Sequence, residues 1–118
     1  MNNNTLVFQG TNFDVVNRSN QPWLKINEIA RTLYSKGGDQ SDGPFESGVR
    51  QLQNLYRRHA DEFTEAMTAL VEVETAGGKQ QMRIFSLRGA HLLAMFARTA
   101  AAKLFRIWVL DILDREID

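Results

Sequence analysis

The stretch that decides the fold is FSLRGAHLLAMFARTAAAKLFRIWVLD, which spans residues 85–111. Two hydroxyl residues within it, Ser86 and Thr99, each stand directly before a run rich in apolar residues. A Ser or Thr side chain accepts a hydrogen bond from the free N–H groups in the first turn of a helix, so both residues are suitable N-caps. The stretch therefore predicts one helix from Leu87 to about Arg98 and a final helix from Ala100 to about Glu116.

The final helix carries more apolar residues than one buried face requires. Its predicted core stripe consists of Ala101, Leu104, Phe105, Trp108 and Ile112. Ile107 and Leu110 lie outside that stripe, which makes them candidate protein-interface residues. A homodimer contact would account for them, and the alternative is that both sides of the helix pack within one monomer.

Upstream of residue 85 the sequence alternates between β-prone and helical runs. Strands are predicted at residues 5–8, 12–16, 23–25, 68–74 and 81–85. A helix is predicted from Glu28 to Tyr34, with Asn27 as its N-cap, and another from Val49 to His59. The segment 35–48 is rich in Gly, Ser and Asp and predicts a flexible loop.

Apolar spacing and turn residues connect these elements into one fold. The first short helix has an apolar stripe, and so has the second; the members are Ile26, Ile29, Ala30, Leu33, Val49, Leu52, Leu55 and Tyr56. The glycine turn at residues 76–79 joins the last two strands into a β-hairpin. We therefore expect an α+β fold, in which a small antiparallel β-sheet with hairpins packs with about four α-helices in a single domain over residues 1–118.

Composition narrows the class of protein. The 118 residues include 43% hydrophobic and 24% charged residues, which is typical of one globular domain. There is no cysteine, so disulfides and thiolate metal sites are excluded, which fits a reducing cytosol. No apolar run approaches the roughly 20 residues that a membrane span needs. The N-terminus lacks the basic and apolar regions of a signal peptide, so we expect no membrane partner and no secretion.

No set of side chains forms a recognisable catalytic or metal constellation. The sequence contains neither a Gly-rich phosphate loop nor a Gly-x-Ser-x-Gly motif. The two histidines, His59 and His91, are far apart in sequence, and His91 stands among apolar residues where a packing role is the usual one. We therefore expect a non-enzymatic protein without a cofactor or a metal site.

Charge is balanced in sum but uneven along the chain. Fourteen acidic residues offset fourteen basic ones, whereas a dedicated nucleic-acid binder is usually more basic. Residues 61–74 contain five acids and no base, and residues 75–110 contain six bases and no acid. A neutral chain with this distribution can carry a basic face, although separate solvated faces would give the same pattern.

Two groups of residues are candidates for DNA contact. The first lies on the helix predicted over residues 49–59 and comprises Arg50, Asn54, Arg57 and Arg58, with Gln51 and Gln53 beside them. Arg, Asn and Gln match the hydrogen-bonding pattern of base edges, and Arg also neutralises phosphates. The second group comprises Arg98, Lys103 and Arg106, and Arg88 and the hairpin residues Lys79 and Arg83 could extend it. Any solvent-exposed helix could have the same composition.

The ordered combination of segments resembles the Bro-N family, the N-terminal domain of phage antirepressors. In the N-terminal half the resemblance rests on Phe8-Gln-Gly10, Val15-Val16, Gln21-Pro-Trp23-Leu24, Asn27-Glu-Ile-Ala30 and Leu33-Tyr34. In the C-terminal half it rests on the runs Phe85–Phe96 and Ala102–Asp111, which are similar to a Leu-x-x-Leu helix followed by an Ala-x-x-Phe-x-x-Trp-Val helix. It covers nearly the whole chain except the segment 35–48.

The resemblance implies an α+β domain of phage, prophage and large DNA virus regulators. Such domains are associated with DNA binding or with antagonising a repressor, and the resemblance implies the cytoplasm of a bacterial host as the place of action. Two hypotheses follow. In the first the chain binds DNA to control phage gene expression; in the second it inactivates a phage repressor by direct contact.

Overall fold

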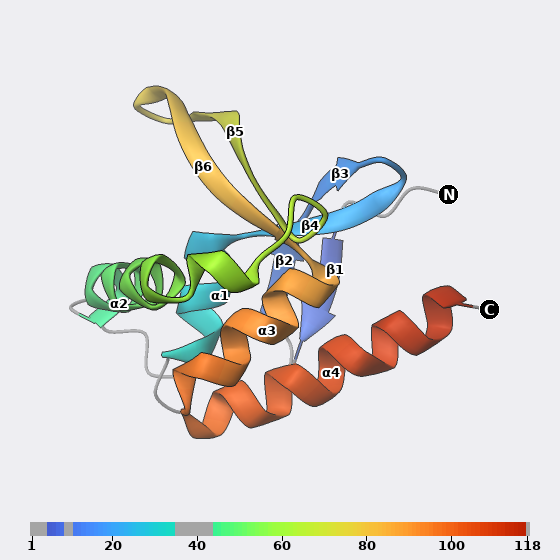
Figure 1. Cartoon of the computed structure of the whole chain (residues 1–118). Helices are drawn as coiled ribbons and strands as arrows, with labels where there is room; N and C mark the ends of the chain where they lie inside the picture. Colours follow the sequence, from blue (N-terminus) through green and yellow to red (C-terminus); the bar gives the residue numbers. More distant parts are fainter. Residues whose placement is uncertain (1–4, 9–10, 35–43, 118) are drawn as a thin grey trace.

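The computed structural model describes residues 5–8, 11–34 and 44–117 and has an α+β fold (Figure 1). Over these described residues, six strands precede or separate the helices: β1 (Thr5–Phe8), β2 (Thr11–Asp14), β3 (Val16–Arg18), β4 (Gln21–Lys25), β5 (Thr68–Thr75) and β6 (Gly78–Ser86). The helices are α1 (Ile26–Leu33), α2 (Pro44–Arg58), α3 (Leu87–Ala97) and α4 (Ala100–Ile117), and a short 3-10 turn, η1 (Ala60–Glu62), follows α2. The expected fold class is confirmed.

The strands form two antiparallel sheets. The larger sheet has the order β3-β4-β6-β5, and β1 pairs with β2 in a separate hairpin. The turn between β3 and β4 uses Ser19 and Asn20, both with positive φ, as the right-handed twist of a two-residue hairpin requires. The β5–β6 hairpin is the longest, with Thr75 paired to Gly78 at its end, and it rises clear of the helices in Figure 1. Its predicted glycine turn is confirmed.

The single strand expected over residues 12–16 is two strands. β2 ends at Asp14 and β3 begins at Val16, so the chain leaves one sheet and enters the other at Val15, whose side chain is buried. An alternating apolar pattern continues through this point, and for that reason periodicity alone does not reveal the break.

Helix α1 begins earlier than predicted. Its apolar stripe, Ile26, Ile29, Ala30 and Leu33, is buried as expected. The expected N-cap, Asn27, is wrong, because the helix begins at Ile26 directly after β4 and Lys25 occupies the cap position. Within the part of the chain that the structure describes, the buried Asn27 Oδ1 has no hydrogen-bond partner.

The flexible loop expected over residues 35–48 is wrong in its last part. Helix α2 starts at Pro44, five residues before the predicted start, because the fixed φ of proline suits the first turn of a helix. Gly48 is helical too, and a Cβ built there would lie 3.1 Å from the Tyr34 Cβ, so glycine permits α2 to approach the end of α1 closely. The rest of that expected loop, residues 35–43, lies outside the described residues.

The two predicted N-caps of the C-terminal helices are confirmed. Ser86 Oγ accepts a hydrogen bond from the Gly89 N–H at 3.1 Å, and Thr99 Oγ1 accepts one from the Ala102 N–H at 3.0 Å. The Thr99 hydroxyl also donates to the Leu33 carbonyl at 2.8 Å, which ties the start of α4 to the end of α1. The α3–α4 pair therefore forms a helical hairpin that packs on α1.

The predicted core stripe of α4 is partly wrong. Phe105 and Ile112 are buried as expected, and Ala101 and Trp108 are half-buried. Leu104 is 46% exposed, and Ala102 and Val109 are buried in its place. The buried face is shifted because α4 is covered by α1 and α3 and also by an aromatic cluster, in which Phe8 and Phe13 pack on Phe105 and Trp108.

Candidate nucleic-acid interface

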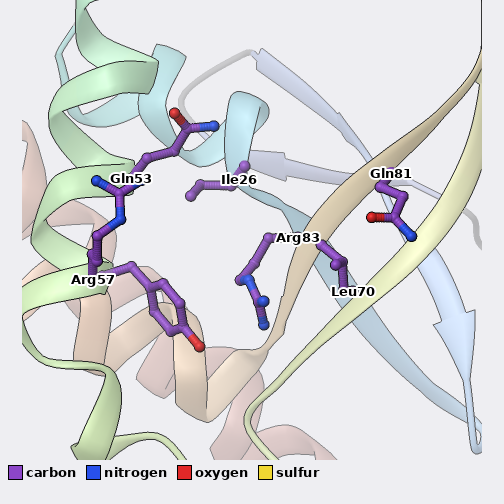
Figure 2. Close-up of a pocket in the computed structure, with 7 residues that line it drawn as sticks. Ile26, Gln53, Arg57, Leu70, Gln81 and Arg83 are labelled. Carbon is purple, nitrogen blue, oxygen red and sulfur yellow. The ribbon is translucent and has the colours of Figure 1, made fainter.

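A groove lies between α2 and the β5–β6 hairpin, and its volume is about 270 Å³. Its lining consists of Ile26, Gln53, Tyr56, Arg57, Leu70, Gln81 and Arg83. Figure 2 shows Gln53 and Arg57 on the helix side and Leu70, Gln81 and Arg83 on the hairpin side, with Ile26 between them. Elements far apart in the sequence therefore contribute to one concave surface.

The regular spacing of residues along a helix and along a strand explains why these side chains face the groove. Gln53 and Arg57 are four residues apart on α2, so they lie one above the other on the same helix face. On the hairpin, Leu70 pairs with Arg83 and Glu72 pairs with Gln81, so alternate residues of both strands point to the groove side. The apolar residues Val71 and Met82 are directed to the other face of the sheet.

Arg83 is held in place by neighbours on both sides. Its guanidinium carbon lies 4.7 Å from the ring centroid of Tyr56, within the range of a cation–π contact. Its Nη1 donates a hydrogen bond to Thr68 Oγ1 at 3.2 Å. Tyr56 is itself packed edge-on against Phe63 and Phe85. The Arg83 charge is thus presented from a pre-organised, half-buried position.

Arg57 is exposed and is oriented by its own helix. Its Nη1 donates a hydrogen bond to Asn54 Oδ1 at 2.8 Å, one turn earlier on α2. A guanidinium carries five N–H donors, so this contact leaves most of them available to a ligand. Arg57 and Arg83 therefore bring two permanent positive charges to opposite sides of the groove.

The charge of the groove is positive, although an acid lies close to it. No Asp or Glu is among the lining residues, whereas two arginines and two glutamines are. Glu72 is the cross-strand partner of Gln81, so its exposed carboxylate is on the same hairpin face. The local surface thus suits an anionic ligand, with Glu72 as the nearest opposing charge along that strand.

One member of the first predicted group of DNA-contacting residues, Arg57, lines this groove, and the other three, Arg50, Asn54 and Arg58, do not. Arg50, Asn54 and Arg57 are exposed and share one face of α2 at spacings of four and three residues. Arg58 is exposed as well, but one further residue rotates it by about 100° away from Arg57. Their role in binding DNA stays a prediction.

The second predicted group lies on the α3–α4 helical hairpin. Arg98 has a left-handed backbone conformation at the end of α3, with φ of 59°. Lys103 is exposed, and Arg106 is half-buried close to His91. Burial, and to a smaller extent the Arg106 charge, lowers the pKa of His91 below its ordinary value. These residues belong to other elements than the groove and stay a second candidate surface. Arg83, which was expected to extend this group, lines the groove instead.

The sequence did not predict that the two sides of the groove meet. Tyr56 was expected only as an apolar helix residue and Gln81 only as part of a strand, whereas Arg83 was expected to extend the second DNA-contact group and not to face α2. Arg83 and Gln81 do alternate along β6 opposite Leu70 and Glu72, which is a signal for a polar hairpin face. The pairing of that face with α2 becomes visible only in three dimensions.

The predicted interface residues Ile107 and Leu110 are both exposed on α4, together with Leu104.

Within the described ranges, no helix is long and apolar enough to cross a membrane. Among the same residues, no cluster of three or more His, Asp or Glu side chains is arranged to hold a metal ion.

Comparison with known proteins identifies a family. No curated protein and no solved structure gives a significant match to this chain. The model of the BRO family, N-terminal domain, matches residues 12–115, which runs from β2 to within two residues of the end of α4. The chain therefore belongs to the BRO family and represents its N-terminal domain, Bro-N.

Proposed function

We propose that this Bro-N domain is a phage-type regulatory domain that binds duplex DNA through the groove between α2 and the β5–β6 hairpin. The single observation that carries the proposal is the convergence of Arg57 and Arg83 on a groove lined with glutamines and without a carboxylate. Family membership supports a regulatory role. As a regulator of phage genes, the domain would act in the cytoplasm of the bacterial host.

The exposed face of α2 supplies the chemistry for such a contact. Arg57 and Arg83 would neutralise backbone phosphates from the two sides of the groove, which releases counterions and drives binding. Arg50, Gln53 and Asn54 carry donors and acceptors that suit base edges in the major groove, whose width admits one helix. The projecting hairpin would lie against the adjacent backbone.

Fluorescence-anisotropy titration of labelled duplex DNA over a series of salt concentrations tests this proposal. We expect the affinity to fall steeply with salt, and the double variant Arg57→Gln/Arg83→Gln to bind at least about tenfold more weakly. The slope of log affinity against log salt should become shallower by about 2, one unit for each lost phosphate contact.

A charge-matched control distinguishes the two candidate surfaces. Arg88→Gln/Arg98→Gln removes the same charge from exposed positions on the α3 helix and its end. Binding by this control should stay within about twofold of the unmodified domain, because only long-range charge is lost. If the control lost affinity and the groove variant did not, the groove would be excluded and the second surface favoured.

Contact with a phage repressor is the alternative function, and the exposed apolar residues Ile107 and Leu110 of α4 favour it. It requires that the domain bind the repressor of its own phage and lower the repressor's affinity for its operator. Operator binding that is unchanged in the presence of excess domain would exclude this alternative.

A further inference from the structure

The outer face of α4 carries three large apolar side chains in a row. Leu104, Ile107 and Leu110 are 46%, 51% and 46% exposed and follow one another at intervals of three residues. Figure 1 shows α4 running along the lower edge of the molecule, far from the β5–β6 hairpin. Exposed apolar residues that cluster on one helix face are typical of a protein–protein contact.

Charged residues frame this apolar row with opposite signs at its two ends. Lys103 precedes it, and Asp111 and Asp114 follow it, all with exposed side chains. Within the part of the chain that the structure covers, none of these three residues forms an ion pair. Each charge is thus available to a partner.

The face is symmetric about Ile107. Leu104 and Leu110 lie three residues to either side of it, and Lys103 and Asp111 lie four residues to either side. In an interface with two-fold symmetry the same patch must be complementary to itself, so a residue on one side of the axis meets the residue equally far on the other side. This face fulfils that condition for both apolar and charged residues.

We propose that a second copy of this chain docks on α4, with the two α4 helices antiparallel and the two-fold axis at Ile107. Leu104 packs against Leu110 of the second copy, Ile107 packs against its counterpart, and Lys103 pairs with Asp111 of the second copy. Parallel docking would instead bring lysine against lysine and aspartate against aspartate. The 18-residue helix is about 27 Å long, which provides room for all of these pairs.

This contact is independent of the proposed DNA binding. The groove is formed by α1, α2, β5 and β6, and α4 contributes no residue to its lining. If self-association is lost, the affinity of each groove for DNA can therefore still be measured. If DNA binding is lost, self-association can still be measured.

Sedimentation velocity over a concentration series, with variants of exchanged charge, tests the proposal. The unmodified chain should show a concentration-dependent monomer–dimer equilibrium. Lys103→Glu and Asp111→Lys should each weaken association by more than about tenfold, because like charges then face each other twice across the axis. A mixture of these two variants should associate again, since every facing pair in the mixed dimer is then of opposite charge.

Two further variants guard against indirect effects. Ile107→Lys should abolish association, because it places two charges at the axis, and Lys79→Glu at the distant hairpin should have no effect. Circular dichroism should show all variants folded, since the changed residues are exposed. A chain that stays monomeric at all concentrations, a dimer insensitive to Ile107→Lys, or a mixture that does not associate would overturn the proposal. So would a repressor found on this face while the chain itself is monomeric.

Discussion

The β1–β2 and β5–β6 hairpins are both antiparallel strand pairs, but they differ in what their side chains contact. The β1–β2 hairpin directs Phe8 and Phe13 onto Phe105 and Trp108 of α4, with ring centroids 5.2–6.0 Å apart. The β5–β6 hairpin directs Gln81 and Arg83 to an open groove beside α2. The first hairpin completes the core, and the second presents a surface.

The difference lies in which residues occupy the alternate positions of the strands. Where they are aromatic, burial stabilises the fold, and a change there is expected to alter the free energy of unfolding. Where they are polar and exposed, a change is expected to alter recognition and leave stability nearly constant. The following predictions test this separation of roles.

The largest effect is expected from Phe13→Ala in β2. Phe13 is 1% exposed and contacts both Phe105 and Trp108, so its loss should lower the free energy of unfolding by about 3–5 kcal/mol. The matched variant Leu70→Ala in β5, at a residue that is 51% exposed, should cost less than about 1 kcal/mol. Chemical denaturation measures both, and equal losses would contradict the separation of roles.

A similar contrast is expected between the root and the tip of the β5–β6 hairpin. A Cβ at Gly89, just after the hairpin, would clash with the Met67 carbonyl oxygen, so the backbone must shift in Gly89→Ala. We expect a loss of about 1–3 kcal/mol. Gly77 at the tip has nothing within 4 Å of such a Cβ, and Gly77→Ala should be nearly neutral in thermal unfolding. A neutral Gly89→Ala would show that α3 is less tightly docked than described.

A gain in DNA affinity is expected when the acid beside the groove is removed. Glu72→Gln eliminates a carboxylate on the groove side of β5 and should strengthen binding roughly twofold to threefold at low salt, with the gain vanishing as salt rises. Asp14→Asn makes the same change of charge on the β1–β2 hairpin and serves as the control in the anisotropy titration. An equal gain in both variants would mean that net charge alone is responsible.

The smallest effect concerns stability against pH. Burial and the Arg106 charge lower the pKa of His91 in the folded state below its ordinary value of 6.5. As the pH falls below 6.5, the unfolded chain binds a proton that the folded chain resists, so the contribution of His91 to stability is present above that pH and is lost below it. His91→Gln should therefore lose less thermal stability than the unmodified chain over this pH range. If both chains lost the same thermal stability as the pH falls, the pKa of His91 would not be the cause of the loss.

Local chemistry explains which elements could be predicted from the sequence. The caps Ser86 and Thr99 and the glycine turn depend on a few neighbouring residues, and all three are confirmed. The start of α2 has a local signal too, Pro44, which the prediction of a loop over residues 35–48 did not use. The exposure of Leu104 depends instead on how other elements pack against α4. Periodicity specifies that a helix has an apolar face but not which neighbour covers it.

The groove shows the same limit of prediction from sequence. Arg57 and Asn54 were predictable as a polar helix face, because their spacing on α2 is regular. The partnership of Arg83 with Tyr56 joins two segments that only the tertiary fold brings together, at 4.7 Å. The sequence therefore named Arg57 and Arg83 in two separate groups and did not predict that they line one groove.

The most direct test of the central claim is a residue-by-residue map of the surface that DNA contacts. Amide chemical shifts of the domain, recorded by NMR during titration with duplex DNA, report which backbone sites change on binding. Our prediction is that the changes concentrate on α2 around Gln53 and Arg57 and on β6 around Gln81 and Arg83, and that β1–β2 is unaffected. Changes confined to β1–β2 or α4, or no changes at low salt, would contradict it.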